Sequence, residues 1–398
     1  MPIVYIAVIA MLIQQAFSTM SGLAIPFLAP PIAAETGLRP SLVGLYTAML
    51  YGSSMLSALG GGGFLLRYGA LRVSQVCLII VALGLLVNIP GYIGFFICGA
   101  ILTGLGAGPA TPASSQLLTR YSLPKHAPLT FSIKQTGVPV GGVLAGILLP
   151  LFVSNFGWQG ALGCVAMMVI LLALILQPLR TTFDSDRQPN RSLTFQDIGS
   201  TLKSVFQNSA VRELSIALFC FTGLQLAFVS FFVLFLTLDL GWTLTQAGFT
   251  YSIAMAGGIV GRVFWGWMGS KYIEPLLLLI ILGLIMGFSS IATGLITEHW
   301  PKFAVWLLTF IFGLTGIGYQ GVLLAKIALV APAGMAGVVT GGAVCFAYAG
   351  MMTLPALFGL ILEVIDTYSV AFVAMGIFPI AASILLLGTM HSSRKIRK

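Results

Sequence analysis

Two basic residues lie inside long apolar stretches of this 398-residue chain. Lys134 falls within residues 128–153, and Arg262 falls within residues 246–269. Neither stretch contains an aspartate or a glutamate. A charge in an apolar surrounding is costly, and it usually marks a binding site or the path of a solute. The simplest partner for both cations is a bound anion, so the first hypothesis is an anion site.

The two cations support this hypothesis to different degrees. Side chains on a helix lean toward its N-terminus. Because the helix at 246–269 is expected to enter from the outside, Arg262 should lean toward the membrane centre. The alternatives for Arg262 are hydrogen bonds to backbone carbonyls or a side chain that reaches the inner interface. Lys134 lies near the cytoplasmic start of its helix, so it either lines the path or reaches the inner interface.

Other polar side chains within apolar stretches could line the same path. From these we select Gln14, Gln225, Tyr319 and Gln320 as candidate substrate-binding residues. Hydrogen bonds between helices would explain each of them equally well.

The residues that usually carry out catalysis or hold metals are poorly placed for either task. All five cysteines lie in apolar runs, and the three histidines lie in loops or in the tail. We therefore expect no metal and no cofactor. The sequence also contains no nucleophile–base pair and no phosphate-binding loop, so we do not expect an enzyme.

The elements that must position these side chains are membrane-spanning helices. Hydrophobic residues make up 58% of the chain and charged residues only 7%, with a mean hydropathy of +1.04, which excludes a soluble domain. About 20 apolar residues are needed to cross a bilayer. Twelve segments meet this requirement: 3–29, 41–64, 73–90, 92–118, 128–153, 159–178, 212–237, 246–269, 275–296, 303–328, 335–362 and 367–389.

The basic residues predict the orientation of these segments. If both termini are cytoplasmic, 15 of the 19 lysines and arginines lie inside, and only Arg39 and Lys302 lie outside. We therefore expect a multi-pass protein of the inner (plasma) membrane. The net charge of +9 is then explained by the topology and by contact with membrane lipids. It does not indicate nucleic-acid binding. We expect a monomer.

The two halves of the chain resemble each other. Gly62 and Arg67 end the second segment, and Gly266 and Lys271 end the eighth, with the two glycines 204 positions apart. Parallel repeats of this kind are typical of transporters. We expect four parts: a six-helix bundle at 1–179, a cytoplasmic linker at 180–211, a second six-helix bundle at 212–390 and a basic tail at 391–398.

The loop after the second segment carries a recognisable motif. Gly62, Arg67, Gly69 and Arg72 fit the pattern G-x-x-x-D-R-x-G-x-x-R, with Leu66 at the aspartate position. In this respect the chain resembles the major facilitator superfamily. The resemblance implies an all-α membrane fold of twelve helices in two pseudo-symmetric six-helix halves. It also implies secondary active transport by alternating access, with these loop residues and their second copy, Gly266 and Lys271, acting in gating.

The surroundings of Arg262 are similar to those in particular members of that family. Gly261-Arg262 followed by Gly266 resembles the G-R-x-x-x-G of organic-anion and monocarboxylate carriers, in which the arginine holds the anion. An arginine suits this role because its fork can bind a carboxylate through two hydrogen bonds. We therefore expect transport of a small organic anion, above all a carboxylate, with Lys134 assisting.

Several alternatives remain open at this point. The protein could export amphipathic compounds as an antiporter, which predicts that Arg262→Ala is tolerated. It could instead be a non-transporting membrane sensor or scaffold, although no segment is long enough for a soluble module. Coupling is open as well: the substrate could carry a proton, Lys134 could titrate, or the carrier could exchange anions.

Overall fold

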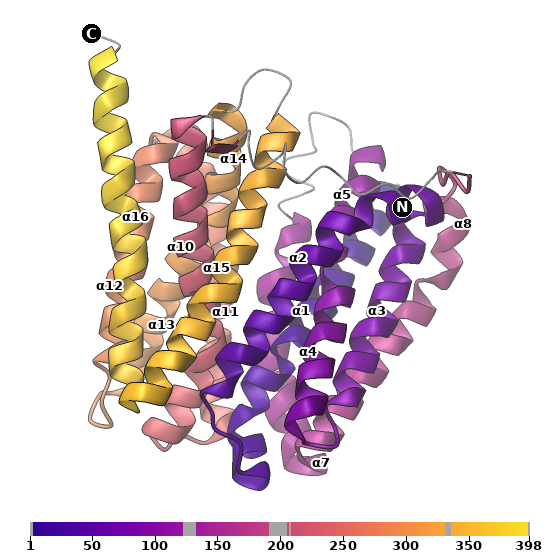
Figure 1. The fold of residues 1–398 in the computed structure, drawn as a ribbon, viewed down its shortest axis with the longest axis horizontal. Helices are drawn as coiled ribbons and strands as arrows, with labels where there is room; N and C mark the ends of the chain where they lie inside the picture. Colours follow the sequence, from indigo (N-terminus) through magenta and orange to yellow (C-terminus); the bar gives the residue numbers. More distant parts are fainter. Residues whose placement is uncertain (1–2, 122–132, 191–204, 207, 331–335, 397–398) are drawn as a thin grey trace. The chain divides into compact units, whose positions relative to one another are not determined.

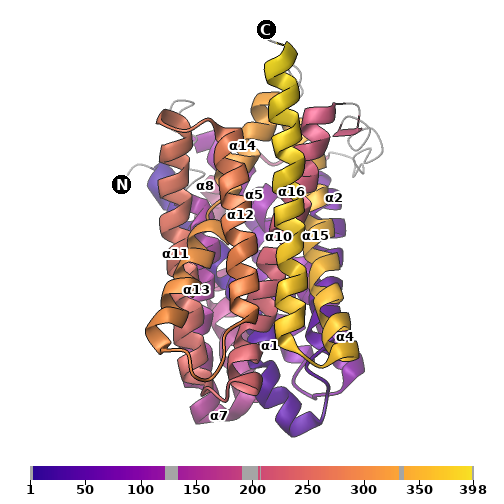
Figure 2. The same ribbon diagram turned by 90° about the vertical axis from the view of Figure 1, so that its left-hand side faces the viewer.

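The computed structural model describes residues 3–121, 133–190, 205–206, 208–330 and 336–396, and within these ranges the chain is helical, without strands (Figures 1 and 2). The earlier elements are α1 (Ile3–Thr36), α2 (Leu42–Tyr68), α3 (Ala70–Val87), α4 (Ile93–Ala107), α5 (Ala110–Tyr121), α7 (Gly137–Ile175), η2 (Gln177–Leu179) and α8 (Arg180–Phe183). The later elements are α10 (Ser209–Leu234), η3 (Phe235–Asp239), α11 (Leu244–Lys271), α12 (Pro275–Gly294), α13 (Lys302–Gly316), α14 (Gln320–Val330), α15 (Ala336–Ile365) and α16 (Tyr368–Ile396).

Ten stretches of the described residues are long and apolar enough to cross a membrane. The longest, Ile133–Phe183, has 51 residues and includes most of the predicted segments 128–153 and 159–178. Between these segments Gly157 has a φ of 69°, a non-helical conformation that divides the stretch. The prediction of an all-helical membrane protein is therefore confirmed.

Two of the predicted segments are each interrupted by a short break in the helix, although each is still one candidate span. The segment 92–118 is interrupted between α4 and α5, where Pro109 cannot donate a backbone hydrogen bond. The segment 303–328 is interrupted between α13 and α14, where Gly316 and Gly318 flank Ile317 and favour the helical conformation only weakly. Each segment as a whole is apolar enough to span a membrane, so its mean hydropathy does not reveal the interruption.

The chain forms two compact units, which we describe separately. The first unit comprises Met1–Pro40 and Met49–Gln196, and the second comprises Ser41–Ala48 and Asp197–Lys398. The predicted linker at 180–211 and tail at 391–398 lie partly outside the described residues, so their boundaries stay predictions.

Within the first unit, α1 packs on α7, and α3 packs on both α4 and α7. Gly137 and Gly141, one turn apart on α7, lie directly against α1. A Cβ atom on Gly137 would lie only 2.6 Å from the carbonyl oxygen of Leu12, and one on Gly141 would meet the carbonyl of Ala16. The missing side chains therefore allow the two backbones to approach closely.

Within the second unit, α10 packs on α15, α12 on α16, and α11 on α13. Phenylalanine rings fill the space between these helices; the centroids of Phe228 and Phe312 lie 3.8 Å apart. The packing of α11 on α13 matters most for function, because it brings Arg262 to the interruption that follows α13.

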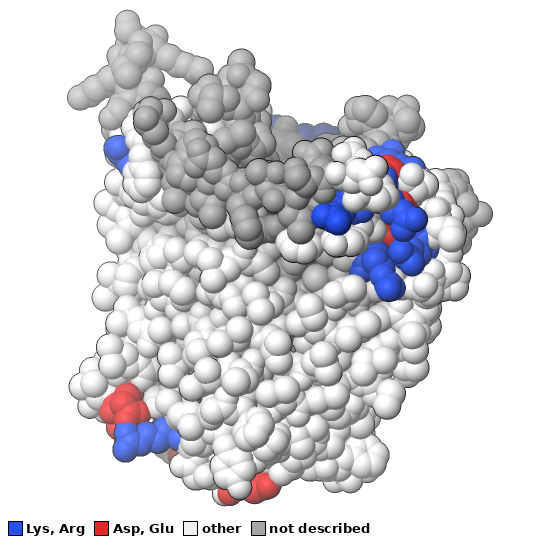
Figure 3. All heavy atoms as spheres, turned by 45° about the vertical axis from the view of Figure 1, so that its right-hand side comes forward, with Lys and Arg blue, Asp and Glu red and all other residues white. Residues whose placement is uncertain are grey.

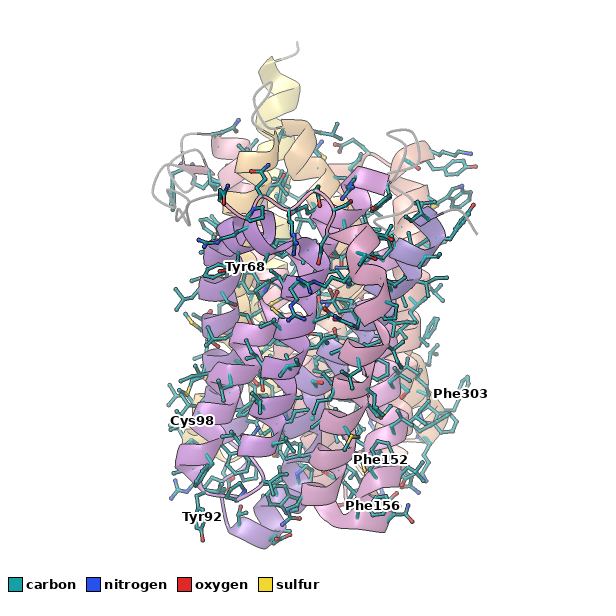
Figure 4. All side chains as sticks on the ribbon, turned by 90° about the vertical axis from the view of Figure 1, so that its right-hand side faces the viewer. Tyr68, Tyr92, Cys98, Phe152, Phe156 and Phe303 are labelled. Carbon is teal, nitrogen blue, oxygen red and sulfur yellow. The ribbon has the colours of Figure 1, made fainter. Side chains whose placement is uncertain are left out.

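Charged side chains and several exposed aromatic side chains lie toward the helix ends. In Figure 4, Tyr68 lies toward one end of the first unit, and Tyr92 and Phe156 lie toward the other; all three are exposed. On the face shown in Figure 3, the coloured charged residues lie toward the ends, with uncharged residues between them. This distribution is the one expected for helices that cross a bilayer.

Candidate functional site

Arg262 lies on α11, half-buried, and contacts the interruption between α13 and α14. Its Nε donates to the carbonyl oxygen of Ile317 at 3.3 Å, and its Nη2 donates to Oε1 of Gln320 at 3.0 Å. Both of these acceptors are neutral groups. The structure thus contains the backbone contact that was one alternative for Arg262.

The interruption explains why Arg262 lies in this place. A helix that ends leaves its last carbonyl groups without intrahelical donors, and its C-terminus carries a partial negative charge that favours a cation. Arg262 satisfies the carbonyl of Ile317, and Trp265, three residues later on α11, donates its indole N–H to the carbonyl of Leu314 at 2.7 Å. Two side chains on one face of α11 therefore hold the end of α13.

Close backbone contact accompanies these hydrogen bonds. A Cβ atom on Gly261 would lie 3.1 Å from Cα of Gly318, and a Cβ atom on either glycine would meet the carbonyl of Leu314. Larger residues at these positions would push α11 away from the interruption. The G-R pair therefore combines a small residue that admits the backbone with the arginine that binds it.

Tyr319 and Gln225 place further polar atoms in the second unit. Tyr319 lies between the two partners of Arg262, Ile317 and Gln320, at the interruption itself, and its side chain is fully buried. Phe221 on α10 contacts its ring edge-on, with centroids 5.2 Å apart. Among the residues that the structure describes, neither Tyr319 Oη nor Gln225 Oε1 has a hydrogen-bond partner.

Lys134 belongs to a separate cluster in the first unit. Its side chain is only 2% exposed, and its Nζ donates to Oε1 of Gln15 on α1 at 2.8 Å. Gln15 in turn donates to Oγ1 of Thr19 at 3.4 Å. Lys134 therefore lies against α1 and does not extend to solvent, in contrast to the alternative in which it reaches the inner interface. Gln14, the neighbouring residue on α1, is buried too.

The loop motif that is predicted to act in gating has a partner that the sequence did not reveal, Asp184. Its carboxylate accepts the backbone N–H groups of Leu71 at 2.8 Å and Arg72 at 2.9 Å, at the start of α3. Gly69 has a φ of 96°, and a Cβ atom there would collide with the Asp184 side chain. Glycine is therefore required both for the turn and for the approach of the carboxylate.

Burial raises the pKa of the Asp184 carboxyl, although the hydrogen bonds from Leu71 and Arg72 and the charge of Arg180 act in the opposite direction. The side chain of Arg72 is exposed, and Arg67 lies 5.5 Å from the ring centroid of Tyr68. Gly62 lies within α2. The contact of Asp184 thus joins the start of α3 to the C-terminus of α8.

The second copy of the motif is built differently. Gly266 faces open space, and Lys271 is exposed at the end of α11. Here Glu274 caps its own helix: its carboxylate accepts the N–H of Leu277 at 3.1 Å and pairs with Lys326 at 2.9 Å. These contacts lower the pKa of the Glu274 carboxyl despite the opposing effect of burial, which is the largest single influence.

The family of the chain is shown by comparison with known proteins. The family model described as Major Facilitator Superfamily matches residues 10–352. The chain belongs to the Major Facilitator Superfamily. This confirms the resemblance predicted from the loop motif, and the family and its relatives named below are transporters.

Two similar proteins are named as transporters of carboxylates. The chain is 22% identical to the probable galactarate/D-glucarate transporter GudP of Bacillus subtilis (strain 168), covering 89% of this chain and 85% of that protein. It is 23% identical to monocarboxylate transporter 13 of Rattus norvegicus, covering 73% and 66%. The crystal structure of the peptide transporter POT in complex with sulfate has the same fold, with a TM-score of 0.77, 16% identity and coverage of 97% and 94%.

Sequence reasoning missed four contributors to these clusters. Asp184 could have been suspected as an acidic residue four positions after Arg180, and Trp265 as a donor one turn from Arg262. Gln15 was passed over in favour of its neighbour Gln14. The carbonyl of Ile317 had no signal in the sequence, because any residue has a carbonyl group.

Proposed function

We propose that this superfamily member is a secondary active transporter that carries a small organic anion, a carboxylate, across the inner membrane by alternating access. The observation that carries the proposal is the half-buried guanidinium of Arg262, bonded to the neutral Ile317 carbonyl and Gln320 amide. The names of the similar proteins, which include a sugar-diacid and a monocarboxylate transporter, support the choice of a carboxylate.

The guanidinium of Arg262 is suited to bind a carboxylate because it is a positively charged hydrogen-bond donor. A guanidinium has five N–H donors in a planar fork, and here two of them bond to neutral acceptors, the carbonyl of Ile317 and the amide of Gln320. Hydrogen bonds between ions are stronger than those to neutral acceptors, so a carboxylate can replace a neutral acceptor with a gain in free energy. Substrate binding would then loosen the hold of α11 on the end of α13, which links occupancy of the site to movement of the helices.

Lys134 is proposed as an assisting cation in the first unit. Its ammonium is buried and donates to the neutral amide of Gln15, so it contributes positive potential within the membrane-spanning part of that unit. Gln14 and Gln320 are proposed to orient the substrate. Protons or an exchanged anion remain the candidates for coupling.

Twelve spans, with both termini in the cytoplasm, are the topology that we propose. The division of Ile133–Phe183 at Gly157 makes two spans of one stretch, and α11, with 28 residues, is long enough to be another. The ten apolar stretches then become twelve. The concentration of basic residues on the side assigned to the cytoplasm supports the orientation.

The proposal is tested by uptake into proteoliposomes of labelled lactate, D-glucarate and an organic cation, with and without a pH gradient. We expect uptake of at least one carboxylate and none of the cation. Arg262→Ala should lower carboxylate uptake at least tenfold, about the effect of losing one hydrogen bond to a charged group. Arg212→Ala, an exposed arginine at the start of α10, is the matched control and should transport normally.

Two results would contradict the proposal. One is carboxylate uptake that remains intact in both Arg262→Ala and Lys134→Ala. The other is transport of the organic cation in place of the carboxylates by the unmodified protein.

A further inference from the structure

Two buried polar atoms in the second unit lack the hydrogen bonds that buried atoms normally make. Among the described residues, nothing bonds to Tyr319 Oη or to Gln225 Oε1, although both atoms are shielded from solvent. An unsatisfied buried polar atom destabilises a protein, and most such atoms in native proteins are satisfied. A polar group supplied by a ligand would remove that cost.

Tyr319 lies where the proposed carboxylate would bind. It immediately precedes Gln320 and follows Ile317 by two residues, and these are the two residues that hold the Arg262 guanidinium. Its ring is fully buried at the interruption between α13 and α14. The edge of Phe221 fixes the position of the tyrosine ring. A ligand held by Arg262 would therefore bring its neighbouring atoms toward the phenol.

Gln225 lies on the same side of α10 as the residue that contacts Tyr319. Phe221 and Gln225 are four residues apart, so their side chains share one face of the helix. That face presents the Phe221 ring to Tyr319. The unsatisfied oxygen of Gln225 is thus one helical turn from the aromatic contact.

The two atoms are chemically complementary to a hydroxyl group. The phenol of Tyr319 can donate a hydrogen bond, and the amide oxygen of Gln225 can accept one. A hydroxyl group does both, whereas a methylene group does neither.

We infer that Tyr319 and Gln225 select carboxylates that carry a hydroxyl group, so that the substrate class is hydroxy-carboxylates. This inference rests on the proposed function, because Arg262 must hold the carboxylate first. Since both atoms are shielded in this structure, their bonds to the ligand form as the site closes around it. An acid without the hydroxyl would leave both atoms unsatisfied in the closed site, and sites of this kind reject such analogues strongly.

The test compares pairs of acids that differ in their hydroxyl groups: lactate with propionate, and D-glucarate with hexanedioate. For each pair, kcat/KM for uptake is measured in proteoliposomes containing the unmodified protein, Tyr319→Phe or Gln225→Met. Tyr368→Phe, a buried tyrosine at the start of α16, is the matched control. The plain acid in each pair shows whether a variant is folded and active.

We expect the unmodified protein to prefer the hydroxylated member of at least one pair by tenfold or more. Tyr319→Phe should reduce that preference about tenfold, through slower uptake of the hydroxylated acid alone. Gln225→Met should act in the same direction, and Tyr368→Phe should leave the preference unchanged.

Equal uptake of plain and hydroxylated acids by the unmodified protein would overturn this inference while leaving the proposed function intact. So would variants of Tyr319 and Gln225 that slow both members of a pair equally. Absence of uptake of all four acids would instead overturn the proposed function, and this inference with it.

Discussion

At the scale of single residues, Arg262 has two tasks that use the same atoms. Its bonds to Ile317 and Gln320 stabilise the interruption after α13, and its charge is the proposed anchor of the anion. The first task explains how an arginine is held within a proposed membrane span before the substrate binds. It also means that a loss of transport in an Arg262 variant must be separated from a loss of stability.

Lys134 provides a stability prediction at the same scale. Gln15→Ala removes one acceptor from a buried ammonium and should lower the free energy of unfolding by about 1.5–3 kcal/mol, the usual range for a hydrogen bond to a charged group. The control is Gln159→Ala, because this half-buried glutamine donates a solvent-exposed hydrogen bond to a charged group, Glu35. Thermal unfolding in detergent would show a clearly larger decrease for Gln15→Ala; equal decreases would contradict the account.

The sequence predicted the types of residue at the site better than their contacts. Sorting the charges by position was enough to select Arg262 and Lys134 as candidates, because very few charges fall within apolar stretches. It could not decide between Gln14 and Gln15, since neighbouring residues on a helix point in different directions and the exact rotation of α1 depends on its packing. Backbone acceptors such as Ile317 depend on where a helix stops.

At the scale of elements, the contact between Asp184 and α3 explains the glycine of the loop motif. The carboxylate lies at the N-terminus of α3, where a negative charge is favoured by the helix dipole. Gly69 leaves the space that this contact needs. Leu66, which replaces the family's aspartate, does not prevent the motif from binding a carboxylate, because Asp184 supplies one from another segment.

Asp184→Asn should destabilise the protein by about 1–3 kcal/mol. An asparagine can accept only one of the two backbone N–H groups, and its amide N–H₂ would face the other donor. Asp186→Asn is the control, because Asp186 is exposed and pairs with Arg120 at the surface. Thermal unfolding measures both; a larger loss for Asp186→Asn would contradict the assignment.

Asp184 also predicts a dependence of stability on pH. Because burial raises its pKa in the folded protein above the ordinary value of 3.8, the folded state binds more protons than the unfolded state between these two values. The contribution of Asp184 to stability should therefore decrease as pH rises through that window and stay constant above it. The difference in melting temperature between the unmodified protein and Asp184→Asn, measured across this range, should show the decrease. An increase with pH would contradict the direction of the shift.

The interrupted helices show the limits of prediction at this scale. Apolar content indicated the segments 92–118 and 303–328, and both are candidate spans. The interruption after α4 could have been suspected from Gly108-Pro109, whereas the one after α13 involves only glycines within an apolar run. Glycine is common in membrane helices, so its presence there does not mark a break.

At the scale of the whole molecule, α11 accounts for part of the difference between ten apolar stretches and twelve proposed spans. This helix is long enough to cross a bilayer but is less apolar than the others, and it is the helix that carries Arg262. A span that binds a polar solute needs polar side chains, and these lower the mean hydropathy by which spans are recognised. The same feature that indicates function therefore makes the span harder to count.

Reporter fusions test the proposed topology. Alkaline phosphatase, which is active only outside, should be active when fused after Thr243 or Trp300 and inactive when fused after Ile273. A fluorescent protein fused after Lys398 should be bright, because the basic residues keep this end in the cytoplasm. Equal phosphatase activity after Thr243 and Ile273 would mean that α11 does not cross the membrane.

The central claim is that Arg262 binds the carboxylate of the substrate, and equilibrium binding tests it most directly. Binding of labelled lactate and D-glucarate to the purified protein would be compared with binding to Arg262→Ala and to the control Arg212→Ala. Thermal unfolding of each sample would verify that it is folded. We predict saturable binding of at least one acid, weakened about 10–100-fold by Arg262→Ala and unchanged by Arg212→Ala. Binding to folded Arg262→Ala that is as tight as to the unmodified protein would contradict the claim.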